Sequence, residues 1–128
     1  FELIDDPRIR TVEHIKRLII ELVHHQDNRL RTNLSQYLAM ECRHDYGTLS
    51  KLFSETQGTT IEKYFIAQKI ERAKELLDYG ELTLNEIADR LNYSSTAHLS
   101  AQFKAQTGYT PRQYRQQKER ARIPLDKI

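Results

Sequence analysis

The chain has few of the residues that build disulfides, tight turns and membrane spans. Its 128 residues include no Trp, one Cys, one Met, three Pro and four Gly. A single cysteine excludes an internal disulfide and suits a reducing, cytoplasmic setting. So few Gly and Pro leave little material for the turns of a β-sheet, so we expect an all-helical fold. No apolar run approaches the length that spans a bilayer, and no signal peptide is recognisable, which predicts no membrane partner.

The charge of the chain is modest in total but uneven along its length. Hydrophobic residues make up 38% and charged residues 30%, as in an ordinary globular domain. The formal net charge is +2, yet residues 101–128 alone carry +5 and the remainder carries −3. A local basic surface fits contact with phosphate groups, and it equally fits a solvated charged face. Charge alone therefore leaves both interpretations open.

One pattern occurs twice, fifty residues apart. The pairs are Leu49 and Leu99, Ser50 and Ser100, Phe53 and Phe103, Gly58 and Gly108, Thr60 and Thr110, and Tyr64 and Tyr114. Upstream, Leu38-Ala39 is matched by Ile87-Ala88 at an offset of forty-nine, so the second copy has one extra residue in its turn. Each repeat is a short helix, a turn and a second helix that ends at a glycine. The usual motif of this form is a helix-turn-helix that binds DNA.

Helix signals place the elements of the first half. Thr11 is expected to cap a helix with an apolar face that includes Val12, Ile15 and Ile19, and the polar segment 24–31 is expected to be a loop. Further helices are expected from about Asn33, from Tyr46 after the cap Asp45, and from Ile61 to Asp78 after Thr59 or Thr60. The long helix from Ile61 has a wide apolar face and is expected to connect the two repeats.

The second half carries clearer local signals. Thr83 and Glu86 form a capping box, and Asn92 is placed to take a left-handed turn after a helix that ends near Leu91. Ser95 is expected to cap the next helix and Gly108 to end it. Thr110-Pro111 opens a last helix, expected to fray after Arg120.

These motifs resemble the DNA-binding domain of the AraC/XylS-type bacterial transcription regulators. The resemblance covers about Leu34 to Arg115, and its most specific part is Phe103-Lys104, Gly108, Thr110-Pro111 and Tyr114-Arg115. It implies two helix-turn-helix subdomains joined by a long central helix, so that with the helix expected after Thr11 as an extra N-terminal helix the whole fold is expected to be all-α. It also implies sequence-specific binding of double-stranded DNA, regulation of transcription, and RNA polymerase as a partner of the full-length protein. No cofactor is implied.

The expected organisation follows from these elements, and because the chain starts at Phe1 rather than Met we expect a fragment of a longer protein. Phe1 to Asp5 is similar to the last strand of a small ferredoxin-like domain that precedes the DNA-binding half in one subgroup of the family. The expected divisions are 1–10, a remnant or linker; 11–32, the N-terminal helix and linker; 33–60, the first repeat; 61–80, the connecting helix; 81–120, the second repeat with the closing helix; and 121–128, a tail.

The length of the connecting helix is expected to set the distance between the two repeats. About 18 residues make a helix about 27 Å long. With the flanking helices added, the two recognition helices are expected about 34 Å apart, one turn of B-DNA. One chain could then enter two adjacent major grooves. The competing interpretation is a duplication that merely built a helical bundle.

The resemblance places the base-facing residues on the second helix of each repeat. In the first repeat they are Tyr46, Gly47, Thr48, Ser50 and Lys51, and in the second Thr96, Ala97, His98, Ser100 and Gln102. Lys51 can donate to guanine or to a phosphate, and Gln102 can bind adenine. Gly47 and Ala101 stand where relatives carry larger side chains, so shape readout is expected to contribute, most of all in the second repeat.

Phosphate contacts are expected from Arg43, Lys104, Arg112 and Arg115 and from helix N-termini near Leu34, Leu84 and Pro111. For each cation, an ordinary solvated role is the competing interpretation. A further set resembles signature residues of the family but is interpreted as core that positions the recognition helices: Leu38, Leu49, Phe53, Ile87, Leu99 and Phe103.

Other functions fit the sequence less well. The five histidines are scattered, and none forms a motif with a nucleophile or a carboxylate pair, so no enzyme is predicted. Cys42, His44 and the His24-His25 pair lack the spacing of metal ligands, and Cys42 lies at an apolar position typical of core. The alternative from another class is a helical protein-interaction or dimerisation module that uses the first helix. That helix could instead pack on the first repeat.

Overall fold

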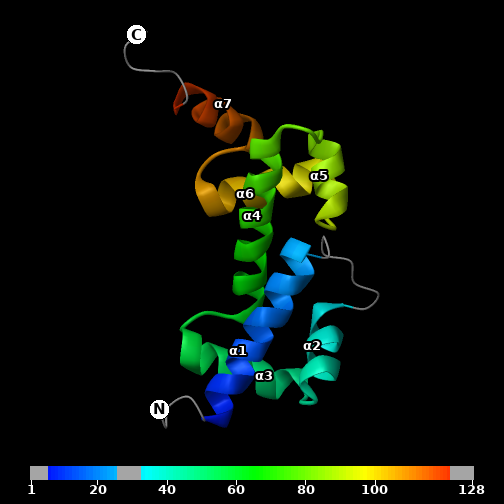
Figure 1. Ribbon diagram of the computed structural model, residues 1–128, viewed down its shortest axis with the longest axis vertical. Coiled ribbons are helices and arrows are strands. Elements are labelled where there is room, and N and C mark those ends of the chain that lie inside the picture. Colours follow the sequence, from blue (N-terminus) through cyan, green and yellow to red (C-terminus); the bar gives the residue numbers. More distant parts are fainter. Residues whose placement is uncertain (1–5, 26–32, 122–128) are drawn as a thin grey trace. The chain divides into compact units, whose positions relative to one another are not determined.

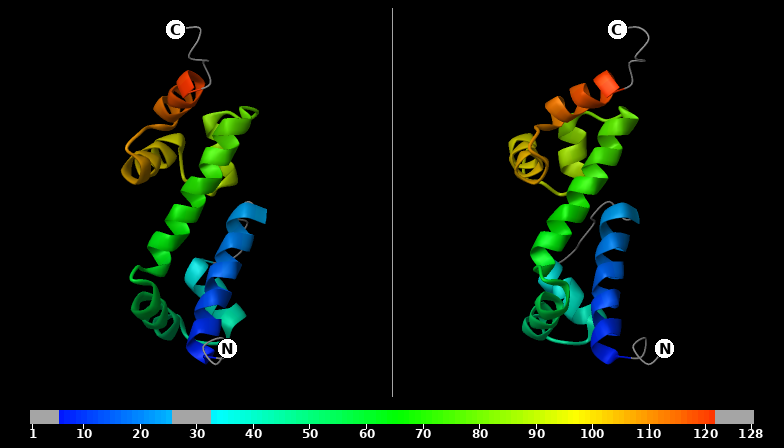
Figure 2. Two further views of the ribbon diagram at one scale, coloured as in Figure 1. Left: turned by 60° about the vertical axis from the view of Figure 1, so that its left-hand side comes forward. Right: turned by 90° about the vertical axis from the view of Figure 1, so that its left-hand side faces the viewer.

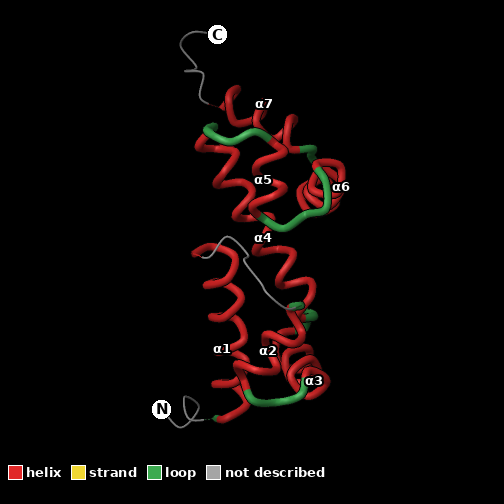
Figure 3. Tube along the Cα trace, turned by 90° about the vertical axis from the view of Figure 1, so that its right-hand side faces the viewer, coloured by secondary structure: helices red, strands yellow, loops and turns green. Residues whose placement is uncertain are grey.

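The structure is a computed structural model that describes residues 6–25 and 33–121, with side chains up to Lys118. The described helices are α1 (Pro7–Ile20), the π-helical segment η2 (Glu21–His25), α2 (Leu34–Cys42), α3 (Tyr46–Gln57), α4 (Ile61–Tyr79), α5 (Leu84–Arg90), α6 (Thr96–Thr107) and α7 (Pro111–Ala121) (Figure 1). The described residues contain helices and loops but no strand, which confirms the all-α class (Figure 3). The expected strand at residues 1–5 lies outside the described residues, and so does the expected tail at 121–128 apart from residue 121, which ends α7.

The predicted caps set most helix starts. Asp45 accepts from the backbone N–H of Thr48 at 3.1 Å, and Ser95 accepts from that of His98 at 3.0 Å. At α4 the cap is Thr60, whose hydroxyl accepts from the Lys63 N–H at 3.0 Å. The remaining described caps follow the same logic: Asn33 for α2, the Thr83–Glu86 box for α5, and a reciprocal pair of bonds between Thr110 and Gln113 for α7. Short polar side chains thus satisfy N–H groups that a helix start leaves without partners.

The start of α1 differs from the prediction. The helix begins at Pro7 and is capped by Asp6, which accepts from the Arg8 N–H at 2.9 Å. Thr11 is inside the helix, where its hydroxyl donates to the Pro7 carbonyl at 2.9 Å. The prediction that Thr11 caps the helix was wrong because Pro7 fits the first helical position, which needs no N–H, so the helix already begins before Thr11.

The end of α1 also differs from the prediction. His24 and His25 belong to η2, which continues α1, rather than to a loop. The imidazole Nε2 of His24 lies 2.8 Å from the Gln68 side-chain oxygen, so this end of η2 contacts α4. The rest of the expected loop lies outside the described residues.

The chain forms two compact units, residues 1–69 and 70–128, which we call unit 1 and unit 2. The division falls inside α4, so this helix contributes to both. The expected residue ranges of the domains and the expected spacing of about 34 Å between recognition helices remain predictions.

Unit 1 is built around one apolar cluster to which α1 and η2 contribute half of the buried residues. The cluster consists of Val12, Ile15, Ile19, Val23, Leu38, Leu49, Phe53 and Ile61, none more than 1% exposed. In this unit α1 packs against α2 and α3 (Figure 2). The apolar face of the first helix is therefore occupied by the core of unit 1, as the packing interpretation predicted.

Unit 2 repeats the same internal arrangement. Here α6 packs against α5 and α7. Ile87, Leu99 and Phe103 are at most 1% exposed, like Leu38, Leu49 and Phe53 in unit 1, which confirms the predicted core set. The edge-on ring pair Phe53–Tyr64, with centroids 5.6 Å apart, is matched by Phe103–Tyr114 at 5.4 Å. The fifty-residue repeat in sequence is thus a repeat in packing.

Candidate nucleic-acid interface

The two helix-turn-helix turns differ by the one residue that the sequence predicted. A left-handed residue follows the first helix of each repeat, Arg43 with φ 59° and Asn92 with φ 65°. One residue separates Arg43 from the cap Asp45, whereas Tyr93 and Ser94 separate Asn92 from the cap Ser95. Tyr93 is 7% exposed, and its N–H donates to the Ala88 carbonyl at 2.8 Å. The extra residue therefore brings an aromatic side chain into the core beside the second recognition helix.

The first turn of α3 is held by its cap. Asp45 accepts from both the N–H and the hydroxyl of Thr48, the latter at 2.7 Å. These bonds and the nearby His44 keep the pKa of Asp45 below its usual value, so it is a carboxylate at neutral pH. A Cβ added at Gly47 would lie 3.2 Å from the Asp45 carboxylate. The absence of a side chain at position 47 thus leaves room for the cap.

Ser50 and Lys51 follow on the next part of α3. Lys51 is exposed and Ser50 is half-buried. The buried Leu49 and Phe53 fix the opposite face of this helix in the core. An exposed ammonium group here can reach guanine O6 or N7, or a phosphate oxygen. This placement agrees with the predicted role of Lys51 and does not test it.

Tyr46, at the first position of α3, is packed and bonded inside unit 1. Its ring packs against the apolar cluster, and its hydroxyl donates to the carboxylate of Glu62 in α4. Burial, first of all, and then the bond to Glu62 raise the pKa of Tyr46.

In α6, two of the predicted base-facing residues use polar atoms inside unit 2. The hydroxyl of Thr96 donates to the Asn85 side-chain oxygen in α5. The amide oxygen of Gln102 accepts from the hydroxyl of the buried Tyr93 at 2.5 Å. Bidentate recognition of adenine uses the amide oxygen and nitrogen of glutamine together, so the Tyr93 bond competes with that contact.

The other predicted residues of α6 are more accessible. Ala97, His98 and Ala101 are exposed, and Ser100 is half-buried. The Ser94 hydroxyl lies 3.2 Å from Nδ1 of His98, and the Tyr93 ring meets the imidazole edge-on at a centroid distance of 5.0 Å. These contacts restrain the ring and leave Nε2 as the nitrogen available to a ligand.

The four predicted phosphate contacts divide into two groups. Arg43, Lys104 and Arg112 are exposed. Arg115 is half-buried, and its Nε and Nη2 atoms are buried without a hydrogen-bond partner in the described structure. A phosphate contact through the whole Arg115 guanidinium would require the side chain to move. Lys118, one turn along α7, lies 3.9 Å from the Asp78 carboxylate.

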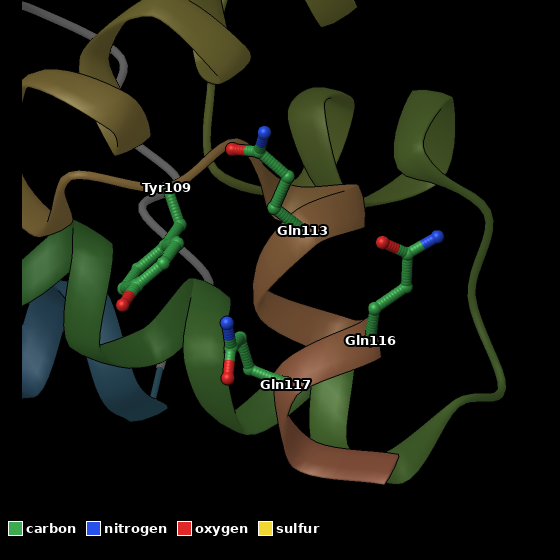
Figure 4. A pocket seen from close by; sticks show the side chains of 4 residues that line it. All are labelled: Tyr109, Gln113, Gln116 and Gln117. Carbon is green, nitrogen blue, oxygen red and sulfur yellow. The ribbon is translucent and has the colours of Figure 1, made fainter. Parts of the chain in front are cut away.

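Features that would indicate another function are sparse in the described part of the chain. No three His, Cys, Asp or Glu side chains gather there as metal ligands, and Cys42 packs against the apolar cluster of unit 1. A surface hollow in unit 2 is lined by Tyr109, Gln113, Gln116 and Gln117, that is, by amides and a phenol (Figure 4). None of the described helices is both long and apolar enough to cross a membrane.

The partners that hold the first residues of α3 and α6 were not predicted from the sequence. Glu62 and Asn85 accept from the first residues of α3 and α6, and Tyr93 and Ser94 contact Gln102 and His98. One signal was present. Positions 46 and 96 are fifty residues apart and both carry a hydroxyl group, so the repeat pairs them as it pairs the core residues.

Comparison with known proteins places the whole repeat region in one family. Residues 34–117 match the family model described as a helix-turn-helix domain. An HTH-type transcriptional regulator of Staphylococcus aureus (strain MSSA476) is 38% identical over 96 residues, which cover 75% of this chain. The matched part spans only 12% of the length of that regulator.

Solved structures share the fold. The C-terminal domain of AraT, a response regulator from Geobacillus stearothermophilus, superimposes with a TM-score of 0.73 at 25% identity, covering 88% of this chain and 86% of that domain. The DNA-binding domain of AdpA, solved with a target DNA, gives a TM-score of 0.68 at 22% identity, covering 92% and 97%. With the family match and the repeated geometry, these likenesses establish that the chain belongs to the helix-turn-helix domain family, as a double helix-turn-helix domain of the AraC/XylS type.

Proposed function

We propose that the chain binds double-stranded DNA sequence-specifically, with α3 and α6 entering adjacent major grooves, and thereby regulates transcription. One observation carries the proposal most directly. The helices α3 and α6 lie in separate compact units and bury equivalent residues in the core. Each of them also has polar residues that are exposed or half-buried. Lys51 and Ser50 occupy this place in α3, and His98 and Ser100 occupy it in α6. A duplex presents its major groove once in every helical turn, so two such helices on one chain fit two successive grooves.

Phosphate anchoring is the second part of the proposal. Arg43, Lys104 and Arg112 are exposed cations near the ends of α2, α6 and α7. Such contacts set the position of a protein on the duplex, and base contacts then select the sequence. Arg115 is a weaker candidate because two of its guanidinium nitrogens are buried.

The interaction-module alternative was to use the exposed remainder of the first helix, which the burial of that helix's apolar face does not test. Val12, Ile15 and Ile19 are at most 1% exposed within unit 1, whereas Ile9 and Ile20 of the same helix are 40% and 37% exposed. RNA polymerase as a partner remains a prediction that rests on the family alone, and action in the bacterial cytoplasm remains one that rests on the family and on the single cysteine.

Salt dependence of DNA binding tests the phosphate part of the proposal. The logarithm of the affinity is expected to fall linearly with the logarithm of the salt concentration, with a slope of about −0.9 per phosphate contact. Arg112→Gln should reduce the slope by about one contact. Lys16→Gln is the matched control, because Lys16 pairs with Glu13 on α1 and the change in net charge is the same. Equal slopes for both variants would contradict the assignment of Arg112, and affinity indifferent to salt would contradict the proposal itself.

A further inference from the structure

The side chain of the first residue of each recognition helix forms a hydrogen bond with a residue of a neighbouring helix. Tyr46 and Thr96 stand fifty residues apart, at the first position of α3 and of α6. Each donates a hydroxyl hydrogen bond to a side chain of another helix, Tyr46 to Glu62 in α4 and Thr96 to Asn85 in α5. The two acceptors differ in chemistry and lie on different helices. The bond therefore recurs at one position of the repeat, although its partner is not repeated.

Tyr46 is poorly placed to contact a base. Its ring is half-buried and packs against the apolar cluster of unit 1, and its hydroxyl is taken up by the exposed Glu62. Glu62 lies in the first turn of α4, and its carboxylate accepts from the phenol. Freeing the hydroxyl for DNA would expose apolar ring surface and leave a carboxylate facing the phosphates, and both changes oppose binding.

Thr96 is held in the same way with a smaller side chain. It is half-buried, and its hydroxyl donates to Asn85, the second residue of α5. The bond joins the two helices of the second helix-turn-helix directly. A threonine hydroxyl has one proton to donate, so the Asn85 bond uses its donor capacity.

The end of the helix that these bonds hold is the end that approaches DNA in helix-turn-helix proteins. The buried residues of α3 and α6 fix the opposite face of each helix, but they lie farther along it: Leu49 and Phe53 in α3, Leu99 and Phe103 in α6. A bond at the first residue adds a constraint where a shift of about 1 Å would matter most for base contacts.

We propose that Tyr46 and Thr96 are positioning residues, which orient α3 through Glu62 and α6 through Asn85 and contact no base. Base contacts then fall to Ser50 and Lys51 in α3 and to His98 and Ser100 in α6. This inference rests on the proposed DNA-binding function.

The test removes each hydroxyl and measures affinity for the preferred duplex together with base preference. Tyr46→Phe and Thr96→Val are expected to weaken binding by about three- to tenfold, the effect of one lost hydrogen bond, with the same preferred sequence. Glu62→Ala should also weaken binding, though less than Tyr46→Phe, because it removes a negative charge together with the bond; in the Glu62→Ala background Tyr46→Phe should cause no further loss. Thr56→Val is the matched control, because the Thr56 hydroxyl donates only to carbonyls of its own helix.

A base-contacting role gives a different pattern. Tyr46→Phe or Thr96→Val would then change the preferred base at one position, and the effect of Tyr46→Phe would add to that of Glu62→Ala. Either result overturns the inference.

Hydrogen exchange separates this inference from the DNA-binding proposal, since it needs no DNA. The amides of Leu49 and Leu99 donate to the carbonyls of the cap residues Asp45 and Ser95, both at 3.2 Å. In Tyr46→Phe the Leu49 amide, and in Thr96→Val the Leu99 amide, should exchange about three- to tenfold faster in the free protein. Unchanged exchange would overturn the inference even if the chain binds DNA. If the variants exchange faster but the original chain binds no duplex, the two bonds do hold the helix starts, and it is the proposed DNA-binding function that is refuted.

Discussion

Truncation of Leu99 is expected to loosen the second recognition helix from inside. The side chain is 1% exposed and faces the core of unit 2 from α6. Leu99→Ala removes three carbons, worth about 0.8 kcal/mol each when buried, or about 2.4 kcal/mol of transfer free energy. The cavity left behind adds to this, so a loss of about 2–5 kcal/mol in the free energy of unfolding is expected. That is a large part of the stability of a small domain, which is about 5–15 kcal/mol.

Urea denaturation followed by far-ultraviolet circular dichroism measures this loss. The control is Gln106→Ala, which shortens an exposed side chain on the same helix and should change the free energy of unfolding by no more than about 0.5 kcal/mol. Leu49→Ala, the equivalent change in α3, should resemble Leu99→Ala because Leu49 is 0% exposed. If Leu99→Ala fell within the range of the Gln106→Ala control, the reasoning from burial and from the repeat would be refuted.

Three further predictions concern base contact, pH and helix capping. Lys51→Ala should weaken binding to the preferred duplex by about 1–3 kcal/mol and relax preference at one base pair, and identical sequence preference before and after would refute a base contact. Burial lowers the pKa of Lys69 to about 8 from 10.5, so the unfolded chain binds this proton more tightly and the free energy of unfolding should rise from pH 8 to 10.5. Lys69→Met should flatten that rise. If the free energy of unfolding depended on pH with the same slope in the variant and in the original chain, the buried placement of Lys69 would be contradicted. Thr83→Ala removes one side of the capping box and should cost about 1 kcal/mol in the same denaturation assay, whereas no change would show that the box contributes nothing.

Much of the fold could be predicted because its signals are local. Asp45, Thr83 and Ser95 cap helices by accepting from backbone N–H groups three residues further along, and such short-range bonds are encoded in adjacent sequence. The buried faces followed from helical spacing together with the fifty-residue repeat. The exception at α1 was also local: Thr11 was predicted as the cap, although Pro7 starts the helix and Asp6 caps it.

The candidate site was less predictable because its bonds join distant positions. Tyr46 bonds with Glu62, sixteen residues away, and Thr96 with Asn85, eleven residues away. A resemblance places a residue on the DNA-facing end of a helix, but it gives no information about which polar atoms are already bonded inside the protein. The same limit applies to Arg115, which was predicted as a phosphate contact and which is partly buried.

Selection of the purified chain against a randomised duplex pool, at two salt concentrations and with sequencing of the retained DNA, tests the central claim most directly. We expect an asymmetric motif with two conserved blocks about one helical turn apart, one for α3 and one for α6, and affinity that falls steeply with salt. Retention of DNA with no enriched sequence, or no retention at low salt, would contradict sequence-specific binding by two helix-turn-helix units.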